Sequence, residues 1–299
     1  MAIVLPTPND APPFACASTP FVKWAGGKTQ LLNELMQHIP QGRPLSYVEC
    51  FAGSAALFFH LRSRGLIQYA TLGDANEELV ATYQVVRDNV ERLIRALRRY
   101  ERMYLQARAP GRRRLYERIR ARSVAPENAV ACAARFIFLN KTGYNGLYRV
   151  NKQGGFNTPH GDGKDKTVCD AENLRACSRA LQGVEIVQGD FANISKPVHR
   201  WRLQPGDVWY ADPPYVPLSA TSDFTSYTKD DFGPDDHKRL RDVALDLKKR
   251  GVHVLLSHSD TPFIHKLYAK GFDIRRVRAR RSINSVTSKR GHVGELLIW

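Results

Sequence analysis

The sequence predicts an α/β protein whose sheet is mostly parallel and has helices on both faces. Five short runs of apolar or β-branched residues, each followed by small or acidic residues, predict strands at 46–50, 68–73, 184–188, 207–211 and 252–257. Amphipathic stretches predict helices between them, for example at 55–64, 77–87 and 235–250. Strands that alternate with helices favour a parallel sheet, and in such sheets ligands bind at the carboxyl ends of the strands.

The first motif of the chain is a glycine pair followed by a lysine. Gly27-Lys28-Thr29 has the ending of a phosphate-binding P-loop, but Val22 stands where that loop needs a glycine and no strand precedes it. Phosphate binding is therefore disfavoured. The two glycines allow the backbone to approach a ligand, and Lys28 can reach a carboxylate. The alternative is a tight turn with a solvated Lys28 and a packed Trp24, and these residues alone leave both open.

The first two strands end in residues that suit a ligand. Small residues around Gly53 allow a ligand to lie against the strand end and the next helix. The G-x-G-x-x-G fingerprint is not present, which disfavours a nucleotide-binding oxidoreductase. Asp74 follows Gly53 by 21 positions, where an acid at a strand end can accept both hydroxyls of a ribose. The alternative is that Asp74 caps the following helix.

The alternation of strands and helices breaks in the middle of the chain. An arginine-dense helical stretch at 92–122 is followed by a loop rich in glycine, asparagine and aromatic residues. We therefore predict that residues 85–180 form a second domain, inserted between 21–84 and 181–299. Residues 1–20, rich in proline and alanine with little charge, are predicted to be a flexible leader.

The most specific motif is Asp212-Pro213-Pro214-Tyr215, at the end of a hydrophobic strand. The two prolines fix φ and lack N–H groups, so the carbonyls there remain available as acceptors. Asp212 adds a carboxylate acceptor and Tyr215 adds a ring face. Acceptors beside an aromatic plane suit a planar ring that bears an amino group. The alternative, a rigid turn with a buried tyrosine, explains fewer of the four residues.

The charge of the chain favours a polyanionic partner. Lys and Arg number 45 against 29 Asp and Glu, a formal charge of +16. Such an excess is typical of nucleic-acid binding and, less often, of contact with an anionic membrane surface. The arginines of 92–122 and a second cluster, Arg275–Arg281 with Lys289 and Arg290, are predicted phosphate contacts. The alternative for each is a solvated face.

Several function classes are disfavoured by what the sequence does not contain. No apolar run of about 18 residues predicts a transmembrane helix, and the N-terminus does not have the pattern of a signal peptide. The five cysteines include no C-x-x-C pair, which argues against a disulfide scaffold or zinc site and fits a reducing cytoplasm. The nine histidines have no metal-ligand spacing, so we expect no metal.

The chain resembles the Dam-type DNA adenine methyltransferases of the D12 class. The similarity spans about residues 20–299 and rests on FVKWAGGK (21–28), YVECFAGSAALF (47–58), GDAN (73–76), FLNKTGYNGLYRVNKQGGFNTPHG (138–161), DPPYVPLSATSDFTSY (212–227), and RRSINSV with GELL near the end. DPPY alone is shared by many amino-methyltransferases, and the continuation after it together with GYNGLYRVN narrows the resemblance. The resemblance implies a Rossmann-like methyltransferase sheet with an inserted helical and hairpin target-recognition domain.

The resemblance also implies the reaction. The chain is expected to move a methyl group from S-adenosylmethionine to the 6-amino group of an adenine flipped out of double-stranded DNA, with GATC as the family's usual target. It is expected to be a cytoplasmic monomer with no metal and no membrane partner, and the family includes restriction–modification enzymes. Positions implied to bind the cofactor are Trp24, Lys28, Phe51, Gly53, Asp74 and Asp212.

Catalysis and target reading are implied at further positions. Asp212, Pro213, Pro214 and Tyr215 are the expected catalytic residues. Positions implied to contact DNA are Lys23, Tyr144, Asn145, Leu147, Arg149, Asn151, Asn157 and Pro159. Arg149 is the candidate for a bidentate contact with guanine, while Leu147 and Pro159 suit the methyl group of thymine.

The sequence departs from the family pattern at two positions. Ala55 stands where the family often has a second glycine, and Val150 stands where it often has tyrosine. The alternatives are therefore a methyltransferase of the same class that acts on another DNA sequence, on cytosine amino groups or on RNA, and a non-catalytic nucleic-acid-binding protein. Asp212 favours adenine, because cytosine enzymes of this type commonly carry serine there.

Overall fold

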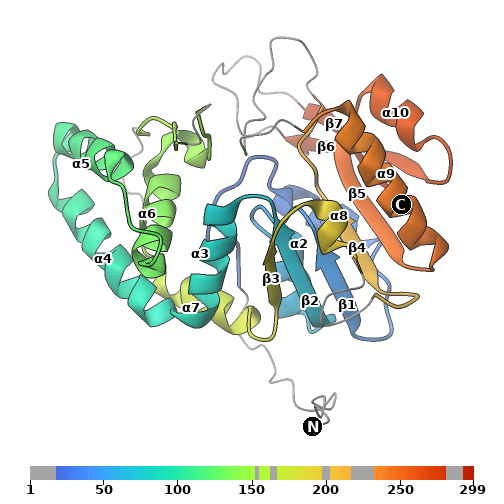
Figure 1. Cartoon of the computed structure of the whole chain (residues 1–299), viewed down its shortest axis with the longest axis horizontal. Coiled ribbons are helices and arrows are strands. Elements are labelled where there is room, and N and C mark those ends of the chain that lie inside the picture. The colour runs from blue at the N-terminus through green and yellow to red at the C-terminus, as the bar shows by residue number, and fades with distance from the viewer. Residues whose placement is uncertain (1–17, 152–154, 162–166, 197–202, 217–231, 281–291) are drawn as a thin grey trace, which may run out of the picture.

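A central sheet organises the molecule (Figure 1). The computed structural model describes residues 18–151, 155–161, 167–196, 203–216, 232–280 and 292–299. Within these residues a seven-stranded sheet has the order β3-β2-β1-β4-β5-β7-β6. The strands are β1 (Leu45–Glu49), β2 (Ile67–Asp74), β3 (Glu185–Gln188), β4 (Val208–Ala211), β5 (His253–Ser259), β6 (Ile274–Arg280) and β7 (His292–Ile298). The first five are parallel, and β7 runs antiparallel to both β5 and β6.

The predicted mostly parallel α/β fold is confirmed, and the five predicted strands differ from the observed ones by at most two residues at an end. The antiparallel strands β6 and β7 were not predicted. Residues 275–281 were interpreted only as a basic cluster, and the packing of apolar Ile274 and Val277 against the cores, which makes this segment a strand, was not recognised. Of the predicted cluster, Arg281, Lys289 and Arg290 lie outside the described residues.

Helices cover both faces of the sheet because side chains of each strand alternate between two cores. Tyr210 of β4 packs in the core shared with α1, α2, α3 and α7, whereas Trp209 packs in the core shared with α8, α9 and α10. The helices of the first face are α1 (Leu32–Met36), α2 (Ala56–Ser63), α3 (Glu77–Asp88) and α7 (Ala171–Ala180), with the 3₁₀ turn η2 (Lys28–Leu31). Those of the second are α8 (Phe191–Ile194), α9 (Pro234–Lys249) and α10 (Pro262–Tyr268).

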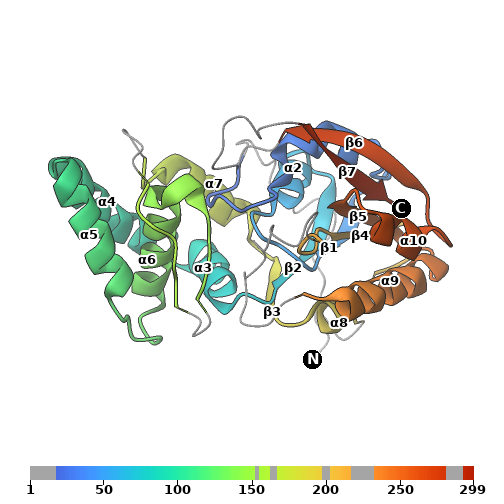
Figure 2. The same cartoon turned by 90° about the horizontal axis from the view of Figure 1, so that it is seen from above.

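The arginine-dense segment is helical, as predicted, and forms two helices. These are α4 (Val90–Gln106) and α5 (Ala109–Ala121), which pack with α6 (Ala129–Thr142) through Leu97, Tyr104, Tyr116 and Phe138. Figures 1 and 2 show these helices at one end of the molecule, beyond α3 and away from α9 and α10. Their apolar side chains are continuous with the core under the sheet, so the helices rest directly on α3 and α7.

A hairpin follows α6. The 3₁₀ turn η3 (Tyr144–Gly146) leads into a segment in which Val150 pairs with Phe156 in an antiparallel bridge. A second bridge joins Gly143 to His160 at the base of the hairpin. Tyr116 and Arg120 of α5 donate hydrogen bonds to the carbonyl of Thr158. The hairpin is therefore carried by the α4–α6 helices.

Candidate active site

The parallel topology brings the predicted site residues to one edge of the sheet. Strand β1 pairs with β2 on one side and β4 on the other, so the carboxyl ends of the three strands are adjacent. Asp74 is the last residue of β2, and Asp212 directly follows β4. The Gly53 loop follows β1 and lies between them. This is the edge at which ligands of parallel sheets bind.

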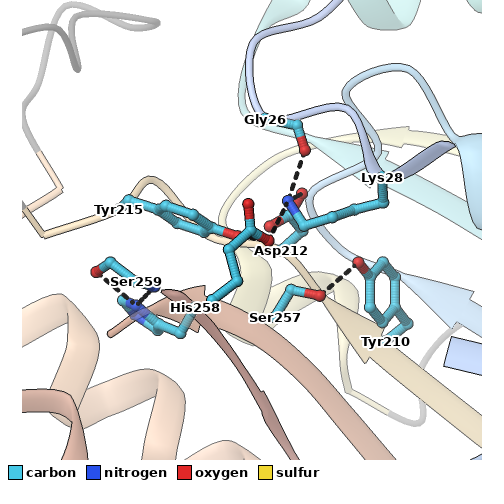
Figure 3. Close-up of polar contacts among 9 residues, drawn as sticks. Gly26, Lys28, Tyr210, Asp212, Tyr215, Ser257, His258 and Ser259 are labelled. Atoms are coloured by element: carbon cyan, nitrogen blue, oxygen red, sulfur yellow. Dashed lines mark hydrogen bonds and ion pairs between the residues drawn. The ribbon is translucent and has the colours of Figure 1, made fainter. Parts of the chain in front are cut away.

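Lys28 contacts the carboxylate of Asp212 (Figure 3). Its Nζ lies 2.7 Å from Asp212 Oδ2 and donates a second hydrogen bond to the carbonyl of Gly26. Lys28 is only 4% exposed, so the interpretation of a solvated lysine was wrong. The glycine turn instead places a buried ammonium group against the Asp212 motif.

Asp212 is a carboxylate with one oxygen still available. Burial raises its pKa to about 6, although the ammonium group of Lys28 counteracts that rise. Oδ2 accepts the Lys28 hydrogen bond, whereas Oδ1 is buried and has no hydrogen-bond partner among the described residues. Buried polar atoms are normally paired, so an orphaned acceptor indicates a place for a donor that arrives with a ligand.

The ring of Tyr215 is fixed at both its hydroxyl and its face. The hydroxyl donates to Glu295 Oε2 at 2.9 Å, and the ring stacks on His258 with centroids 5.6 Å apart. Lys28 Nζ lies 4.9 Å from the ring centroid. Pro213 is buried between Asp212 and Pro214. The described part of the motif is thus a stiff strand extension with an aromatic ring at its end, and residues 217–227 of the quoted motif lie outside the described residues.

Asp74 ties two loops together and does not cap the helix. Its Oδ2 accepts from the Gly53 N–H at 3.0 Å, and its Oδ1 accepts from the Asn76 N–H at 2.9 Å. The cap of α3 is Asn76, whose side chain accepts from the Leu79 N–H. The helix-cap interpretation of Asp74 was therefore wrong. Burial raises the pKa of Asp74, and its two backbone hydrogen bonds oppose that rise.

Trp24 and Phe51 form aromatic surfaces next to the Gly53 loop. Gly53 has φ of +47°, and a Cβ added there would lie 2.7 Å from Trp24 Cδ1. The Trp24 ring stacks on Tyr148 of the hairpin, with centroids 5.3 Å apart. Phe51 stacks on Phe191. Trp24 is therefore packed, and it packs against the Gly53 loop that is predicted to bind the cofactor.

Three groups in this region, the buried Glu49 and His258 and the partly buried Glu295, were not assigned to the site by sequence reasoning. Glu49, the last residue of β1, accepts a hydrogen bond from the Tyr47 hydroxyl, and burial raises its pKa to about 8. Glu295 of β7 holds Tyr215, and His258 of β5 supports the Tyr215 ring. An acid inside an otherwise apolar strand was the available signal for Glu49 and Glu295. No comparable signal distinguished His258 from the other histidines.

The hairpin presents most of the predicted DNA-contacting residues to solvent. The exposed positions are Tyr144, Asn145, Arg149, Asn151, Asn157 and Pro159, and Leu147 is partly buried. The Asn157 N–H donates to the Arg149 carbonyl at 2.7 Å, which fixes the register of the two arms. Lys23 is tied to the same region, because Asn140 bonds both its backbone N–H and its carbonyl and also bonds the Gly146 carbonyl.

The two arginine clusters differ in their surroundings. Residues 90–122 contain 12 arginines and 3 glutamates, a balance of +9 out of +16 for the chain. On β6, by contrast, Arg275 is bonded to Gln37 and paired with Glu34, and Arg276 is paired with Asp260. The α4–α5 surface is therefore the larger uncompensated positive surface among the described residues.

Two absences hold for the described part of the chain. No group of three or more His, Cys, Asp or Glu side chains is arranged to hold a metal ion there. None of its helices combines the length and the apolar character that crossing a bilayer requires.

Comparison with a family model and comparison with individual proteins both identify methyltransferases. The family model for D12 class N6 adenine-specific DNA methyltransferases matches residues 24–283. The chain is 41% identical to the type II methyltransferase M.MjaIII of Methanocaldococcus jannaschii, over 93% of this chain and 98% of that protein. It is 37% identical to the type II methyltransferase M1.LlaDCHI of Lactococcus lactis, over 93% and 94% of the two chains. A DNA adenine methylase of Vibrio cholerae is 32% identical over the same shares.

Proposed function

Because the chain belongs to the D12 class of N6 adenine-specific DNA methyltransferases, we propose that it uses S-adenosylmethionine to methylate the 6-amino group of an adenine flipped out of double-stranded DNA. The observation that carries the proposal is the buried Asp212 Oδ1, which has no hydrogen-bond partner among the described residues. An exocyclic amino group is the donor that this acceptor suits.

The chemistry of the site fits a cationic methyl donor. Asp212 and Glu295 each have a carboxylate oxygen within 4.0 Å of Lys28 Nζ, so two carboxylates face one ammonium group there. S-adenosylmethionine carries a sulfonium and an ammonium group, so a surplus of carboxylates favours its binding. When bound, it supplies an electrophilic methyl group.

Each cofactor position has a distinct proposed role. Asp74 holds the ribose hydroxyls with the lone pairs that its two backbone hydrogen bonds leave available. Gly53 allows the Trp24 ring to pack against the loop beside the cofactor, because a Cβ there would lie 2.7 Å from Trp24 Cδ1. Trp24 and Phe51 provide apolar walls, and Lys28 orients Asp212.

The target base meets the strand extension that begins at Asp212. A base in a duplex is stacked and paired, so it must be flipped out at a cost of a few kcal/mol. Tyr215 stacks on the flipped ring, while Asp212 Oδ1 and the Pro213 carbonyl accept the two amino hydrogens. These hydrogen bonds draw the nitrogen toward tetrahedral geometry and direct its lone pair outward. Proximity and orientation contribute about 7–11 kcal/mol to such a direct transfer.

We also propose that residues 85–180 form the target-recognition domain of a monomeric enzyme. The exposed hairpin residues read the bases, with Arg149 paired to a guanine of GATC. The arginines of α4 and α5 contact phosphates of the flanking duplex. The family description and the name of the Vibrio cholerae relative support DNA as the substrate, and GATC is proposed from the resemblance to Dam-type enzymes.

The experiment is plasmid methylation followed by detection of modified bases at single-nucleotide resolution. We expect 6-methyladenine within GATC, made only when S-adenosylmethionine is added. Asp212→Ala should keep the fold and abolish transfer, and full activity in that variant would contradict the proposed site. Methylated cytosine, or adenine methylated in another sequence, would overturn the base or the target assignment. Arg149→Ala should relax the preference at one base pair by about 1–3 kcal/mol.

A further inference from the structure

The imidazole of His258 lies directly against the ring of Tyr215. His258 belongs to β5 and is fully buried. The two ring planes are 15° apart, with centroids separated by 5.6 Å, which is a stacked arrangement. In the view of Figure 3, His258 lies below Tyr215. His258 is thus a direct neighbour of the ring on which the flipped adenine is proposed to stack, although it belongs to none of the motifs of the chain.

Hydrogen bonds determine which nitrogen of His258 carries the proton. The Ser259 N–H donates to His258 Nδ1 at 2.8 Å, so Nδ1 is an acceptor and is unprotonated. A neutral imidazole then carries its proton on Nε2. That Nε2–H donates to Nδ1 of His237 at 3.1 Å. The imidazole is therefore held at both nitrogens and has little freedom to rotate.

The second histidine keeps the pair neutral and in place. His237 of α9 is only 2% exposed, and the edge of its ring meets Phe232 with centroids 4.7 Å apart. Burial lowers the pKa of His237 to about 4 and that of His258 well below its ordinary value. Both rings consequently stay uncharged at neutral pH, and His258 presents a flat, neutral face to Tyr215.

We propose that His258 is a positioning residue that holds the Tyr215 ring in the orientation needed to stack on the target adenine. Glu295 fixes the hydroxyl end of Tyr215, and His258 covers one face of its ring. The base would stack on the face that His258 does not cover, beside Lys28 Nζ, which lies 4.9 Å from the ring centroid. Through Tyr215, the imidazole thereby sets the distance between the adenine amino group and Asp212. This inference rests on the proposed function and extends it to a residue outside the DPPY motif.

The test separates the stacking ring from its hydrogen bonds. His258→Ala removes both, whereas His258→Phe keeps a flat ring and loses the bonds to Ser259 and His237. His253→Ala, at the exposed start of the same strand, is the matched control. Single-turnover methylation of a duplex with one target site is measured together with cofactor affinity and melting temperature. If the alanine variant does not fold, His258→Asn replaces it, because asparagine keeps an acceptor for the Ser259 N–H without a ring.

We expect methyl transfer to slow in His258→Ala and to recover in His258→Phe, which keeps an aromatic ring. His258→Ala should slow methyl transfer about tenfold, which corresponds to the loss of one aromatic stack, and leave cofactor affinity within about twofold. His258→Phe should recover most of the rate even though its melting temperature falls as far as that of His258→Ala. A target adenine replaced by 2-aminopurine should fluoresce more strongly with His258→Ala, because the base is stacked less firmly.

Two results overturn the inference and leave the proposed function standing. One is an unchanged rate in a folded His258→Ala enzyme. The other is an equal loss of rate in the alanine and phenylalanine variants that follows their loss of stability. If the wild-type protein transfers no methyl group to adenine in plasmid DNA, the proposed function itself fails, and that outcome is seen before any variant is made.

Discussion

Lys28 Nζ and Asp212 Oδ2 lie 2.7 Å apart although the two residues are separated by 184 positions in the chain. The ion pair joins the first glycine turn of the sequence to the extension of β4. The two oxygens of the Asp212 carboxylate consequently differ. Oδ2 accepts the hydrogen bond from Lys28, and Oδ1 has no hydrogen-bond partner among the described residues. Lys28 therefore controls both the orientation and the charge of the group proposed to accept the adenine amino hydrogen.

The first prediction concerns the pH dependence of the reaction. Burial raises the pKa of Asp212 to about 6, and the proposed role needs the deprotonated carboxylate. We expect kcat/KM to fall as pH drops below about 6, since this parameter reports groups of the free enzyme. Lys28 lowers the pKa of Asp212, so Lys28→Met should move the acidic limb to higher pH.

The matched control for that profile is Lys238→Met, on the exposed side of α9, which should leave the acidic limb where it is. The measurement is the methylation rate from pH 5 to 8 at a subsaturating DNA concentration. An acidic limb that stays in place when Lys28 is replaced would show that Asp212 does not govern it.

The second prediction concerns the close approach of Gly53 to Trp24. Gly53→Ala puts a Cβ 2.7 Å from Trp24 Cδ1, on a backbone with φ of +47°. Because the indole is stacked on Tyr148, it cannot move aside without cost. We expect a loss of about 2–4 kcal/mol of stability from backbone strain and overpacking. Cofactor affinity, measured by calorimetry, should fall at least about tenfold, a loss of about 1.4 kcal/mol.

Gly65→Ala separates those two causes. Gly65 also has a positive φ, of +70°, but a Cβ there meets nothing within 4 Å. It should cost only the backbone strain of about 1–2 kcal/mol and leave cofactor affinity unchanged. Equal effects of the two substitutions would mean that the contact between Gly53 and Trp24 does not matter.

The third prediction uses the buried acid at the end of β1. Burial raises the pKa of Glu49 from 4.5 to about 8 in the folded protein. The folded state therefore binds more protons than the unfolded state between these values, and stability from this group is full below pH 4.5 and lost as pH rises toward 8. Glu49→Gln keeps an acceptor for the Tyr47 hydroxyl and removes the charge. We expect the variant to be more stable than the wild type at pH 9, by a few kcal/mol.

Urea unfolding at pH 6 and pH 9 measures that difference. Glu127→Gln, at an exposed position, is the control and should follow the wild-type curve at both pH values. If Glu49→Gln loses stability as steeply with pH as the wild type does, Glu49 is already ionised in the folded protein.

The sequence indicated where the site would form better than it indicated how the site is built. Alternating strands and helices were enough to predict that Asp74 and Asp212 would meet at one sheet edge, because parallel strands end together. The alternative that Asp74 caps α3 was wrong, because Asp74 and Asn76 are both good capping residues and only the residue at which the helix begins decides between them.

The side-chain contacts that hold Tyr215 could not be predicted from the sequence. Glu295 and His258 matter through Tyr215, from strands that are not neighbours of it in sequence. No local pattern reports such packing. Strand β6 was not predicted, because its many arginines drew attention to its charge. Its apolar residues, which pack in the core, are the feature that indicates a strand.

The last prediction concerns the positive surface of α4 and α5. Residues 90–122 carry a balance of +9, and Arg95, Arg99 and Arg102 are exposed at helical spacing on α4. Each phosphate that a protein neutralises adds about 0.9 to the slope of log affinity against log salt. Replacing the three arginines with glutamine should therefore lower that slope by up to about 3 and weaken binding to all DNA sequences alike. Arg239 and Arg241 of α9 and Arg250, which directly follows it, are each paired with an aspartate and supply the matched triple variant. Helix α9 lies at the other end of the molecule from α4 (Figure 1). Fluorescence anisotropy with a labelled duplex between 50 and 300 mM salt measures the slope for both triple variants.

A slope that falls equally in both variants would show that net charge, and not contact by α4, governs DNA affinity. An unchanged slope in the α4 variant would assign its arginines to solvent.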